Sequence, residues 1–391
     1  MLTIGFVVQR YGREVIGGSE TLARDLAERL VKAGMRIIVF TTCARDYLTW
    51  RNDYAAGESV LRGVLIRRFQ VRRERNMEDF NRLSDSFFAA APKDRDEQKW
   101  LEEQGPYCPA LVEALAADQK DIDLFFFFTY LYYPTVVGSG VVSKPVVLFP
   151  TAHDEAPIYL QAMNPVFNRP QALFFLTRAE MELTQRLFSP PGQLRLVRTG
   201  IDIPVDVSEK PFRARHLLVA PYLLYAGRIE KGKGLEAVFE YFRTIQKETY
   251  AELILIGKKL MEIPAIQGLK YLGYVSEADK LAAFRGAVLS VQPSPLESLS
   301  ITTLESFAVE TPVLVNRRCA ALVEHVEASR GGLAYENGHE FLEGFRQLYR
   351  RPALRRRMGR RGLEYVRQYY SWEAVLGEIK AGISEVLGTT I

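Results

Sequence analysis

The sequence predicts an α/β protein made of two doubly wound, Rossmann-like parallel-sheet domains that face each other across a cleft. Short apolar runs alternate with helical segments along nearly the whole chain, which is typical of parallel sheets covered by helices. The alternation lapses from Asp202 to Pro221 and then restarts, so a linker divides two such series. The chain has 391 residues, 48% of them hydrophobic and 25% charged, and each half is long enough to bury a core.

Six apolar-rich runs predict the strands of the first half, because short runs of this kind are typical of buried parallel strands. They are Thr3–Val8, Arg36–Thr42, Val64–Phe69, Leu124–Phe128, Pro145–Phe149 and Ala172–Leu176. A helix is expected from about Ser19, because Leu22, Leu26 and Leu30 share one stripe. Two further helices are expected over Glu97–Gln104 and Arg178–Leu187.

The second half repeats the pattern. Its expected strands are Leu223–Ala226, Ala251–Ile256, Ala287–Gln292 and Pro312–Val315. Its expected helices are Lys233–Gln246, Ser276–Phe284, Ile301–Val309, Gly338–Tyr349, Ala353–Tyr369 and Glu373–Val386. These elements predict domains over residues 1–205 and 206–370, followed by a last helical segment over 371–391.

Charge and cysteine content exclude several classes of protein. The net charge of +4 is too small for a dedicated nucleic-acid binder. The cysteines Cys43, Cys108 and Cys319 are too far apart in sequence for a disulfide framework or a zinc knuckle, so we expect a cytoplasmic protein without a metal. The first residues lack the basic region of a signal peptide and are expected to form a strand. The uncharged stretch Leu124–Ser143 contains Pro134, which favours a strand, a loop and a helix start over a membrane span.

A candidate anion site follows the first strand of the second half. Gly227-Arg228 ends that strand, and Lys233-Gly234 opens the next helix five residues later. The backbone N–H groups of a helix N-terminus and two nearby cations together suit a pyrophosphate. Two solvated surface cations beside a turn are the alternative.

A second candidate site lies after Ala287–Gln292. Glu297 is in the following loop, and Ser300 is expected to cap the helix that carries Glu305. Carboxylates beside an anion site would repel a phosphate unless they bind hydroxyl groups, and sugar and ribose hydroxyls fit. A pair of ordinary helix-capping glutamates is the alternative.

The first half offers a glycine loop and a histidine. Gly17-Gly18 lies between the first strand and the first helix, but no acidic residue ends the second strand, so a nicotinamide dinucleotide site is poorly supported. His153 follows the strand Pro145–Phe149 and is expected to point at the cleft, with a structural histidine as the alternative. His325 and His339 lie in charged stretches of sequence.

Together these motifs resemble those of the retaining, GT-B-fold glycosyltransferases of family 4, within the glycosyl transferases group 1. The resemblance covers nearly the whole chain. It rests on Gly17-Gly18, Thr151-x-His153, Gly227-Arg228 with Lys233-Gly234, the spaced pair Glu297 and Glu305, Thr199–Asp202, and Tyr370–Glu373. It implies that the last helix crosses back to the first domain. Thr199 replaces the usual asparagine, and Ser-Leu-Ser follows Glu297 where Gly-Phe-Gly is commoner.

The resemblance implies roles for the donor residues. Arg228 and Lys233 would hold the diphosphate of a nucleotide sugar. Glu305 would bind the ribose hydroxyls, and Glu297 the hydroxyls of the donor sugar. Four further residues would contact the donor. The N–H groups of Leu299 and Ser300 would meet the sugar and the distal phosphate, and Tyr274 and Val275 would pack on the nucleobase.

The resemblance also implies roles in the first domain. His153 would line the sugar near the anomeric carbon, completing a catalytic set with Glu297, Arg228 and Lys233. Gly18 would face the diphosphate, and Gly17 the acceptor. Tyr130, with two neighbouring tyrosines, is a further acceptor-side candidate because its ring could stack on a sugar; a place in the core is the alternative.

The expected activity is that of a retaining hexosyltransferase-type enzyme. It would move a sugar from a UDP- or GDP-sugar to a hydroxyl group of a glycan, a lipid-linked saccharide or a small molecule. Cations at the leaving diphosphate would stabilise the growing negative charge without a metal or another cofactor. Two alternatives stay open: a sugar-nucleotide epimerase, which the few histidines disfavour, and a non-catalytic sugar-nucleotide-binding protein, which the complete motif set disfavours.

Two arginine clusters suggest peripheral contact with the inner face of a membrane or with an anionic acceptor. A solvated charged surface is the alternative. The first-half cluster, the more interesting of the two, is Arg62, Arg67, Arg68, Arg72, Arg73 and Arg75. The second-half cluster is Arg350, Arg351, Arg355, Arg356, Arg357, Arg360 and Arg361.

Overall fold

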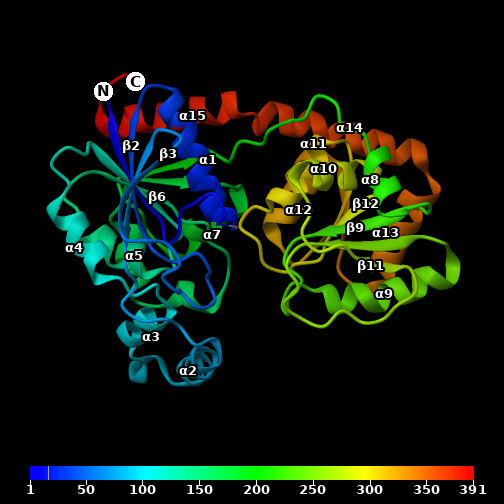
Figure 1. The fold of residues 1–391 in the computed structure, drawn as a ribbon, viewed down its shortest axis with the longest axis horizontal. Coiled ribbons are helices and arrows are strands. Elements are labelled where there is room, and N and C mark those ends of the chain that lie inside the picture. The colour runs from blue at the N-terminus through cyan, green and yellow to red at the C-terminus, as the bar shows by residue number, and fades with distance from the viewer. Residues whose placement is uncertain (16) are drawn as a thin grey trace. The chain divides into compact units, whose positions relative to one another are not determined.

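The computed structural model describes residues 1–15 and 17–391, which form two compact units. Unit 1 comprises Met1–Leu176, Glu180–Val197 and Ile379–Ile391, and unit 2 comprises Thr177–Ala179 and Arg198–Glu378. Each unit has one largely parallel sheet with helices on both faces (Figure 1). Two doubly wound parallel-sheet domains are therefore confirmed.

The sheet of unit 1 has the strand order β3-β4-β2-β1-β5-β6-β7-β8. Its strands are β1 (Thr3–Val7), β2 (Arg36–Thr42), β3 (Gly57–Leu61), β4 (Val64–Phe69), β5 (Leu124–Phe128), β6 (Val146–Phe149), β7 (Ala172–Phe175) and β8 (Gln193–Leu196). All neighbours pair in parallel except β3 with β4, which form an antiparallel hairpin at one edge. The chain builds outward in both directions from β1, so the strand order reverses between β1 and β5.

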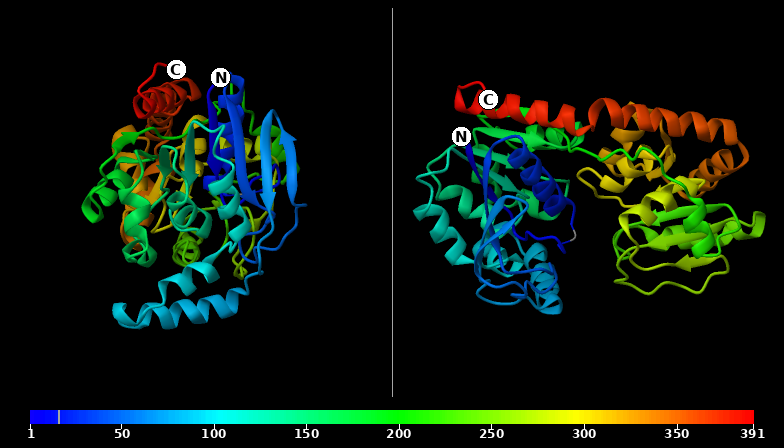
Figure 2. Two further views of the ribbon diagram at one scale, coloured as in Figure 1. Left: turned by 90° about the vertical axis from the view of Figure 1, so that its left-hand side faces the viewer. Right: turned by 45° about the horizontal axis from the view of Figure 1, so that its top comes forward.

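The helices of unit 1 fill the connections between these strands. They are α1 (Gly18–Lys32), α2 (Met77–Ala89), α3 (Glu97–Gln104), α4 (Pro109–Ala117), α5 (Tyr133–Val136), α6 (Met163–Asn168) and α7 (Arg178–Leu187), with short 3-10 turns η1 (Pro92–Asp94), η2 (Gly138–Gly140) and η3 (Ala156–Tyr159). The pair α2 and α3 stands apart from the strands of this unit (Figure 2). Asn76 caps α2 by accepting from the N–H groups of Glu78 and Asp79.

The sheet of unit 2 has the order β11-β10-β9-β12-β13-β14, and every pair is parallel. Its strands are β9 (Tyr222–Ala226), β10 (Glu252–Ile256), β11 (Leu269–Tyr271), β12 (Leu289–Gln292), β13 (Val313–Asn316) and β14 (Gly332–Tyr335). Its helices are α8 (Lys210–Arg215), α9 (Leu235–Glu248), α10 (Glu277–Gly286), α11 (Ile301–Ala308), α12 (Ala320–Ser329), α13 (Gly338–Arg350) and α14 (Pro352–Tyr369). Here the strand order reverses between β9 and β12.

The last helix, α15 (Trp372–Leu387), begins in unit 2, and its residues from Ile379 onward belong to unit 1. In unit 1, Arg195 and Glu385 form an ion pair of 2.7 Å, which ties this helix to the end of β8. Both termini therefore lie in unit 1, close to one another (Figures 1 and 2).

Aromatic packing explains the uncharged stretch Leu124–Ser143. It forms β5, α5 and η2, and all five residues of β5 are buried. The Phe126 ring contacts the rings of Phe6 and Phe149 at centroid distances of 5.3 Å each, so the phenylalanines fill the core of unit 1. Within the described residues, no helix has both the length and the apolar character needed to cross a membrane.

Two sequence motifs that are far apart in the chain meet in unit 2. The Ile201 N–H donates to the Tyr370 carbonyl at 2.7 Å. Gly200 packs so closely on the Trp372 ring that a Cβ there would overlap it. The segments Thr199–Asp202 and Tyr370–Glu373 therefore act as one packed joint, and its close approach requires glycine at position 200.

Candidate functional site

The strand-order reversal of unit 2 places side by side the two loops that carry predicted site residues. In parallel sheets, ligands bind beyond the carboxyl ends of the strands where the order reverses. In unit 2 that point lies between β9 and β12, which pair directly. The loop after β9 carries Arg228 and Lys233, and the loop after β12 carries Glu297. We call the group Arg228, Lys233, Glu297, Leu299, Ser300 and Glu305 the β9–β12 site.

The two cations of this site are placed by different means. The Tyr225 hydroxyl donates to the Arg228 carbonyl at 2.7 Å, which fixes the backbone where the arginine leaves the strand. The Arg228 guanidinium lies 3.1 Å from Glu230 and stays 42% exposed. Lys233 donates from Nζ to Glu297 Oε1 at 2.6 Å, with both side chains largely buried. Lys233 and Glu297, which the sequence places in two separate candidate sites, are thus in direct contact.

Close backbone approaches shape this end of the sheet. Gly257, at the end of β10, lies against the Gly227 carbonyl, and a Cβ on Gly257 would overlap that oxygen. The Ile229 N–H donates to the Lys258 carbonyl at 2.8 Å, which joins the loops after β9 and β10. Two lysines, Lys258 and Lys259, therefore lie next to the Arg228 loop, a feature that sequence analysis missed because the contact is between strands.

Gly234 should be one of the least replaceable residues of the site. It has φ 77° in the left-handed region, and a Cβ would overlap the Pro293 carbonyl. We expect Gly234→Ala to lower the free energy of unfolding by more than about 1 kcal/mol and to weaken nucleotide-sugar binding, measured by thermal unfolding with and without ligand.

Gly232 supplies the matched control for that variant. It has φ 86°, but a Cβ there would meet no atom within 4 Å. Gly232→Ala therefore reports the backbone cost alone. Equal loss of ligand binding in both variants would show that the Pro293 contact is irrelevant to the site.

The loop after β12 ends in a strained serine. Ser300 occupies the N-cap position of α11 with φ 70° and ψ 80°, a conformation that favours glycine. The sequence suggested that its hydroxyl caps a backbone N–H of α11, but it does not. The Ser300 Oγ lies instead 3.0 Å from the Thr303 hydroxyl. The expectation of a Ser300 side-chain cap is wrong, because the left-handed backbone turns the hydroxyl toward the threonine.

Two backbone carbonyls of this loop accept hydrogen bonds from side chains of α12 and of the residue before it. Cys319 donates from Sγ to the Glu297 carbonyl at 3.7 Å, and His325 donates from Nε2 to the Leu299 carbonyl at 2.7 Å. Because C=O and the next N–H point in opposite directions across a trans peptide, the N–H groups of Ser298 and Ser300 face away from these anchors. Among the described residues, the Ser300 N–H meets no acceptor, as the predicted contact with a phosphate or sugar requires.

His325 is a positioning residue. Its charged neighbours in the sequence suggested charged surroundings, and that expectation is wrong. His325 is fully buried on α12. Because its Nε2 donates to a carbonyl, Nδ1 accepts from the Tyr365 hydroxyl, at 3.2 Å. Burial lowers the pKa of the imidazole to about 4. His325 is therefore neutral at pH 7 and supports the loop through hydrogen bonds rather than charge.

This burial predicts a pH-dependent loss of stability. The unfolded chain takes up a proton at His325 near pH 6.5, whereas the folded chain does so only near pH 4. The stabilising contribution is complete above pH 6.5 and decreases as the pH falls toward 4, by about 3 kcal/mol in all. Denaturant unfolding of His325→Gln should show a flatter profile in this window.

A second histidine controls for general acid effects. His339 is exposed at the start of α13, so His339→Gln should keep the full wild-type pH dependence. Parallel profiles for wild type and His325→Gln between pH 4 and 6.5 would contradict the assignment.

Glu305 lies on α11 and has an oxygen available to a ligand. Lys280, on α10, donates to Glu305 Oε1 at 2.8 Å and also lies 2.8 Å from Glu277. Glu305 Oε2 is buried and meets no hydrogen-bond donor in the described chain. Burial raises the pKa of the Glu305 carboxyl above its ordinary value, against the opposing effect of Lys280. A buried oxygen of this kind suits a ligand hydroxyl.

The expected nucleobase residues lie just before α10. Tyr274 is 60% exposed, and Val275 packs partly against a core cluster of unit 2. Gly273, which precedes them, accepts from the Gly257 N–H at 2.9 Å, so the loop is attached to the carboxyl end of β10. An exposed ring next to a partly buried valine is a suitable surface for a flat base.

In unit 1, the glycine loop follows β1 on one side of the strand-order reversal. Gly17 packs against the carboxylate of Glu20, which accepts from Arg10 Nε at 2.9 Å and from Gln9 Nε2 at 2.8 Å. A Cβ on Gly17 would overlap that carboxylate, whereas a Cβ on Gly18 would meet no atom within 4 Å. The open space at Gly18 is consistent with close approach of a ligand.

His153 and Tyr130 meet at a residue that the sequence analysis did not select. Glu155 accepts from the Tyr130 hydroxyl at 2.8 Å and lies 3.4 Å from His153 Nε2. Burial would raise the pKa of Glu155, but hydrogen bonds from His153 and Tyr130 outweigh it and lower the pKa. Tyr130 is only 1% exposed and belongs to the core, so its ring is not available to stack on a sugar in this structure.

The backbone near His153 is strained. Thr129, after β5, and Thr151, after β6, have φ values of 67° and 49°, which are unfavourable for β-branched residues. Their hydroxyl groups bond each other at 3.1 Å. Strain of this kind is often retained at functional sites, and it adjoins the predicted catalytic histidine. In the described part of the chain, no group of three or more His, Cys, Asp or Glu residues is arranged to hold a metal ion.

The chain is similar to a protein-family model and to curated proteins over part of its length. The family model "Glycosyl transferases group 1" matches residues 208–365, which lie in unit 2. A glycogen synthase of Thermus thermophilus is 28% identical over 195 residues, which are 46% of this chain and 42% of that protein. A D-inositol 3-phosphate glycosyltransferase of Pseudarthrobacter chlorophenolicus is 28% identical over 155 residues, or 36% and 37% of the two chains. The chain spans about half the length of the curated relatives it matches, or less.

Solved structures match over almost the full length. Sucrose-phosphate synthase from Thermosynechococcus elongatus superposes with a TM-score of 0.76 at 18% identity, covering 99% of this chain and 100% of that one. Anabaena Alr3699/HepE, solved in complex with UDP and glucose, gives 0.72 at 14% identity, covering 98% and 100%. WaaG, a glycosyltransferase involved in lipopolysaccharide biosynthesis, gives 0.67 at 14% identity, covering 98% and 100%. The chain shares the fold of these proteins.

Proposed function

We propose that the protein is a retaining glycosyltransferase of family 4 that moves a sugar from a nucleotide-diphosphate donor to a hydroxyl group. The proposal is supported by the family match over unit 2 and by relatives that are glycogen synthases. The observation that carries it is the β9–β12 site, where Lys233 contacts Glu297 at 2.6 Å and Glu305 Oε2 is buried without a donor. Cations for a diphosphate and carboxylates for hydroxyl groups stand together at one strand-order reversal.

In this mechanism the chain's charges act on the leaving group. As the anomeric C–O bond breaks, positive charge grows on the sugar ring and negative charge on the nucleoside diphosphate. Arg228, Lys233 and the N–H groups at the start of α11 stabilise the negative charge where it develops, so the proposal includes no metal ion. Glu297 binds donor-sugar hydroxyls, and Glu305 binds the ribose.

Retention of configuration follows if the acceptor attacks from the side that the diphosphate leaves. A phosphate oxygen of the leaving group then accepts the acceptor's proton, and no protein side chain serves as the base. His153, oriented by Glu155, lines the sugar in this scheme. Exclusion of water around the donor would limit its hydrolysis.

A ligand screen tests the proposal. Structure neighbours were solved with UDP-glucose and with UDP, so UDP-glucose is the first probe, compared with GDP- and ADP-glucose. A true donor should raise the thermal midpoint because it binds only the folded chain. Release of free nucleoside diphosphate on adding candidate acceptors, with an α-linked product, would support a retaining transferase. An epimerised donor formed without an acceptor would instead favour an epimerase, and no effect of any nucleotide sugar would refute both.

We further propose that α14 contacts anionic lipid headgroups. Most of the first-half arginine cluster is engaged within the protein: for example, Arg67 pairs with Asp118 at 2.8 Å and Arg75 is 8% exposed. On α14 the residues Arg356, Arg357, Arg360 and Arg361 are exposed, and in the described chain none has a carboxylate partner. Exposed cations of this kind attract a negatively charged membrane surface.

Vesicle pelleting measures this contact. Phosphatidylglycerol vesicles should pellet wild type at low salt, binding should fall as salt rises, and charge reversal of the four α14 arginines should abolish it. Charge reversal at Arg62, which is paired with Glu28 at 2.7 Å, is the control. No pelleting of wild type at low salt would refute the proposal.

A further inference from the structure

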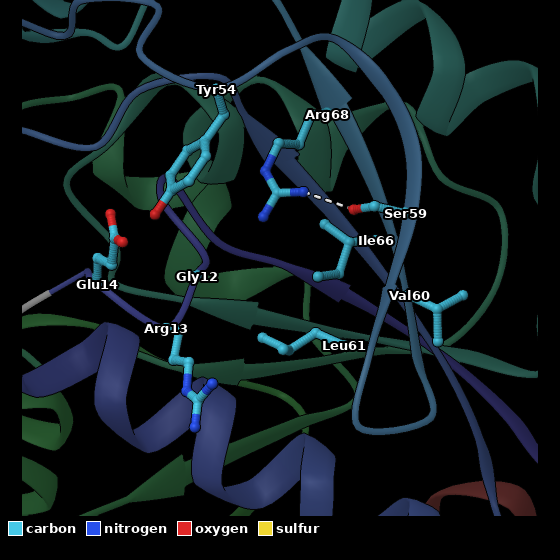
Figure 3. A pocket seen from close by; sticks show the side chains of 9 residues that line it. All are labelled: Gly12, Arg13, Glu14, Tyr54, Ser59, Val60, Leu61, Ile66 and Arg68. Carbon is cyan, nitrogen blue, oxygen red and sulfur yellow. Dashed lines mark hydrogen bonds between the residues drawn. The ribbon is translucent and has the colours of Figure 1, made fainter.

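The function proposed above assigns no part to the residues that line a separate hollow in unit 1. The hollow has a volume of ≈ 230 Å³ and lies among the loop after β1, the segment after β2, and the hairpin of β3 and β4. Figure 3 shows the Arg68 guanidinium and the Tyr54 ring side by side on one wall, with Arg13 and Glu14 across from them. This volume is below the roughly 300–1,000 Å³ of pockets for drug-sized ligands, so it suits a small molecule.

The position of the hollow is one where parallel sheets bind ligands. Gly12 lies in the loop after β1, Tyr54 donates its N–H to the carbonyl of Cys43, directly after β2, at 2.9 Å, and Arg68 is the second-last residue of β4. These are the carboxyl ends of three neighbouring parallel strands. The β3–β4 hairpin adds an apolar wall, to which Leu61 and Ile66 contribute.

Arg68 is a half-buried cation without a counter-ion. Its Nη1 donates to the Ser59 hydroxyl at 2.7 Å and its Nη2 to the Tyr11 carbonyl at 3.0 Å. Its Nε is buried and has no acceptor, and no described carboxylate lies within ion-pair distance. The guanidinium stacks 4.6 Å from the centroid of the Tyr54 ring. Desolvating a cation without pairing it is unfavourable, and an anion in the hollow would remove that cost.

A second polar atom in the same wall lacks a partner. The Tyr54 hydroxyl is buried and forms no hydrogen bond with the described residues. It lies against Gly12, where a Cβ would be 2.6 Å from it. Burial raises the pKa of Tyr54, so the hydroxyl keeps its proton and can donate it to an acceptor oxygen.

The other charges at the hollow do not cancel that of Arg68. Glu14 is largely exposed and pairs with Arg45 at 2.9 Å. Arg13 is exposed and has no ion pair with the described residues. Two arginines, Arg13 and Arg68, line the hollow, and the one carboxylate in its lining, Glu14, is paired with Arg45. The hollow is therefore positively charged.

We propose that this hollow, which we call the Arg68 pocket, binds the phosphate or carboxylate of a small organic ligand. The anion accepts from Arg68 Nε and from the Tyr54 hydroxyl, and the rest of the ligand lies on Leu61 and Ile66. The ligand that carries this anion is either the acceptor of the proposed sugar transfer or a separate small-molecule effector. The anion site itself does not depend on the proposed function.

Binding of defined probes tests the anion site. Glucose 6-phosphate and glucuronate are titrated by calorimetry, with glucose as the uncharged comparison and no nucleotide sugar present. We expect at least one charged probe to bind while glucose does not. Arg68→Gln should weaken binding about tenfold or more, and Tyr54→Phe severalfold. Arg68→Lys keeps the charge but loses the Nε–H, so its affinity should lie between those of wild type and Arg68→Gln.

Arg67 provides the matched control on the same strand. It pairs with Glu58 and with Asp118, and Arg67→Gln should bind the probe as wild type does. Thermal midpoints without ligand verify that every variant is folded. Equal probe affinity in wild type and Arg68→Gln, or no binding of any charged probe, would overturn the proposal.

Two further arms identify the source of the anion. With UDP-glucose present, a glycosylated product of the bound probe identifies an acceptor, and a changed rate of UDP release without such a product identifies an effector; both support the pocket. If no UDP-, GDP- or ADP-glucose binds or reacts while binding of the probe still depends on Arg68, the proposed function fails and the Arg68 pocket stands.

Discussion

Lys233→Ala should lower the turnover of a nucleotide-sugar donor by about a hundredfold to a thousandfold, the usual effect of removing one group that stabilises a developing anion. The variant loses the cation that contacts Glu297 at 2.6 Å, so that carboxylate would also face the diphosphate without compensation. The measurement is the release of nucleoside diphosphate under saturating donor, for whichever donor stabilises the wild type.

Lys231 is the matched control for this prediction. It lies two residues earlier in the same loop and is exposed. Lys231→Ala should turn over the donor at nearly the wild-type rate, because a solvated charge outside the site contributes little. If the two variants lose the same activity, Lys233 acts through the general charge of the loop and the leaving-group assignment is wrong.

Glu305→Ala should mainly weaken donor binding. The buried Oε2 is placed to accept a hydroxyl group, and a hydrogen bond to a charged acceptor is worth about 1.5–3 kcal/mol. The Michaelis constant for the donor should therefore rise about tenfold to a hundredfold with a smaller change in kcat. Lys280 keeps Glu277 at 2.8 Å, so the variant does not leave a buried lysine unpaired.

Steady-state kinetics with varied donor checks the ribose assignment. Glu310→Ala is the control, since Glu310 follows α11 and pairs instead with Arg285 at 2.8 Å. An unchanged Michaelis constant in Glu305→Ala, or an equal rise in both variants, would show that Glu305 does not contact the donor.

A strand could be predicted from the sequence where it is buried and its residues are therefore apolar. β5 consists of five buried residues with four consecutive phenylalanines, and its predicted bounds agree with the structure. β3 could not be predicted, because Gly57–Leu61 is an exposed edge strand whose pairing with β4 decides its conformation. The helix α2 was missed for a similar reason, since Phe87 is its only buried residue.

The site residues follow a similar division. Residues within one motif, such as Glu297 and Glu305, can be read from spacing and from resemblance to a family. Their partners come from other elements: Lys280 reaches Glu305 from α10. Glu155, which joins His153 to Tyr130, has no signal in the sequence beyond being an acidic residue after a strand. These contacts depend on packing in three dimensions, which a single sequence does not record.

The loop after β12 owes its shape to side chains that are turned away from any ligand. Cys319 and His325 hold the carbonyl oxygens of Glu297 and Leu299 from the rear. Substitution of Cys319 or His325 would thus alter the course of this loop while leaving Lys233, Glu297 and Glu305 themselves unchanged.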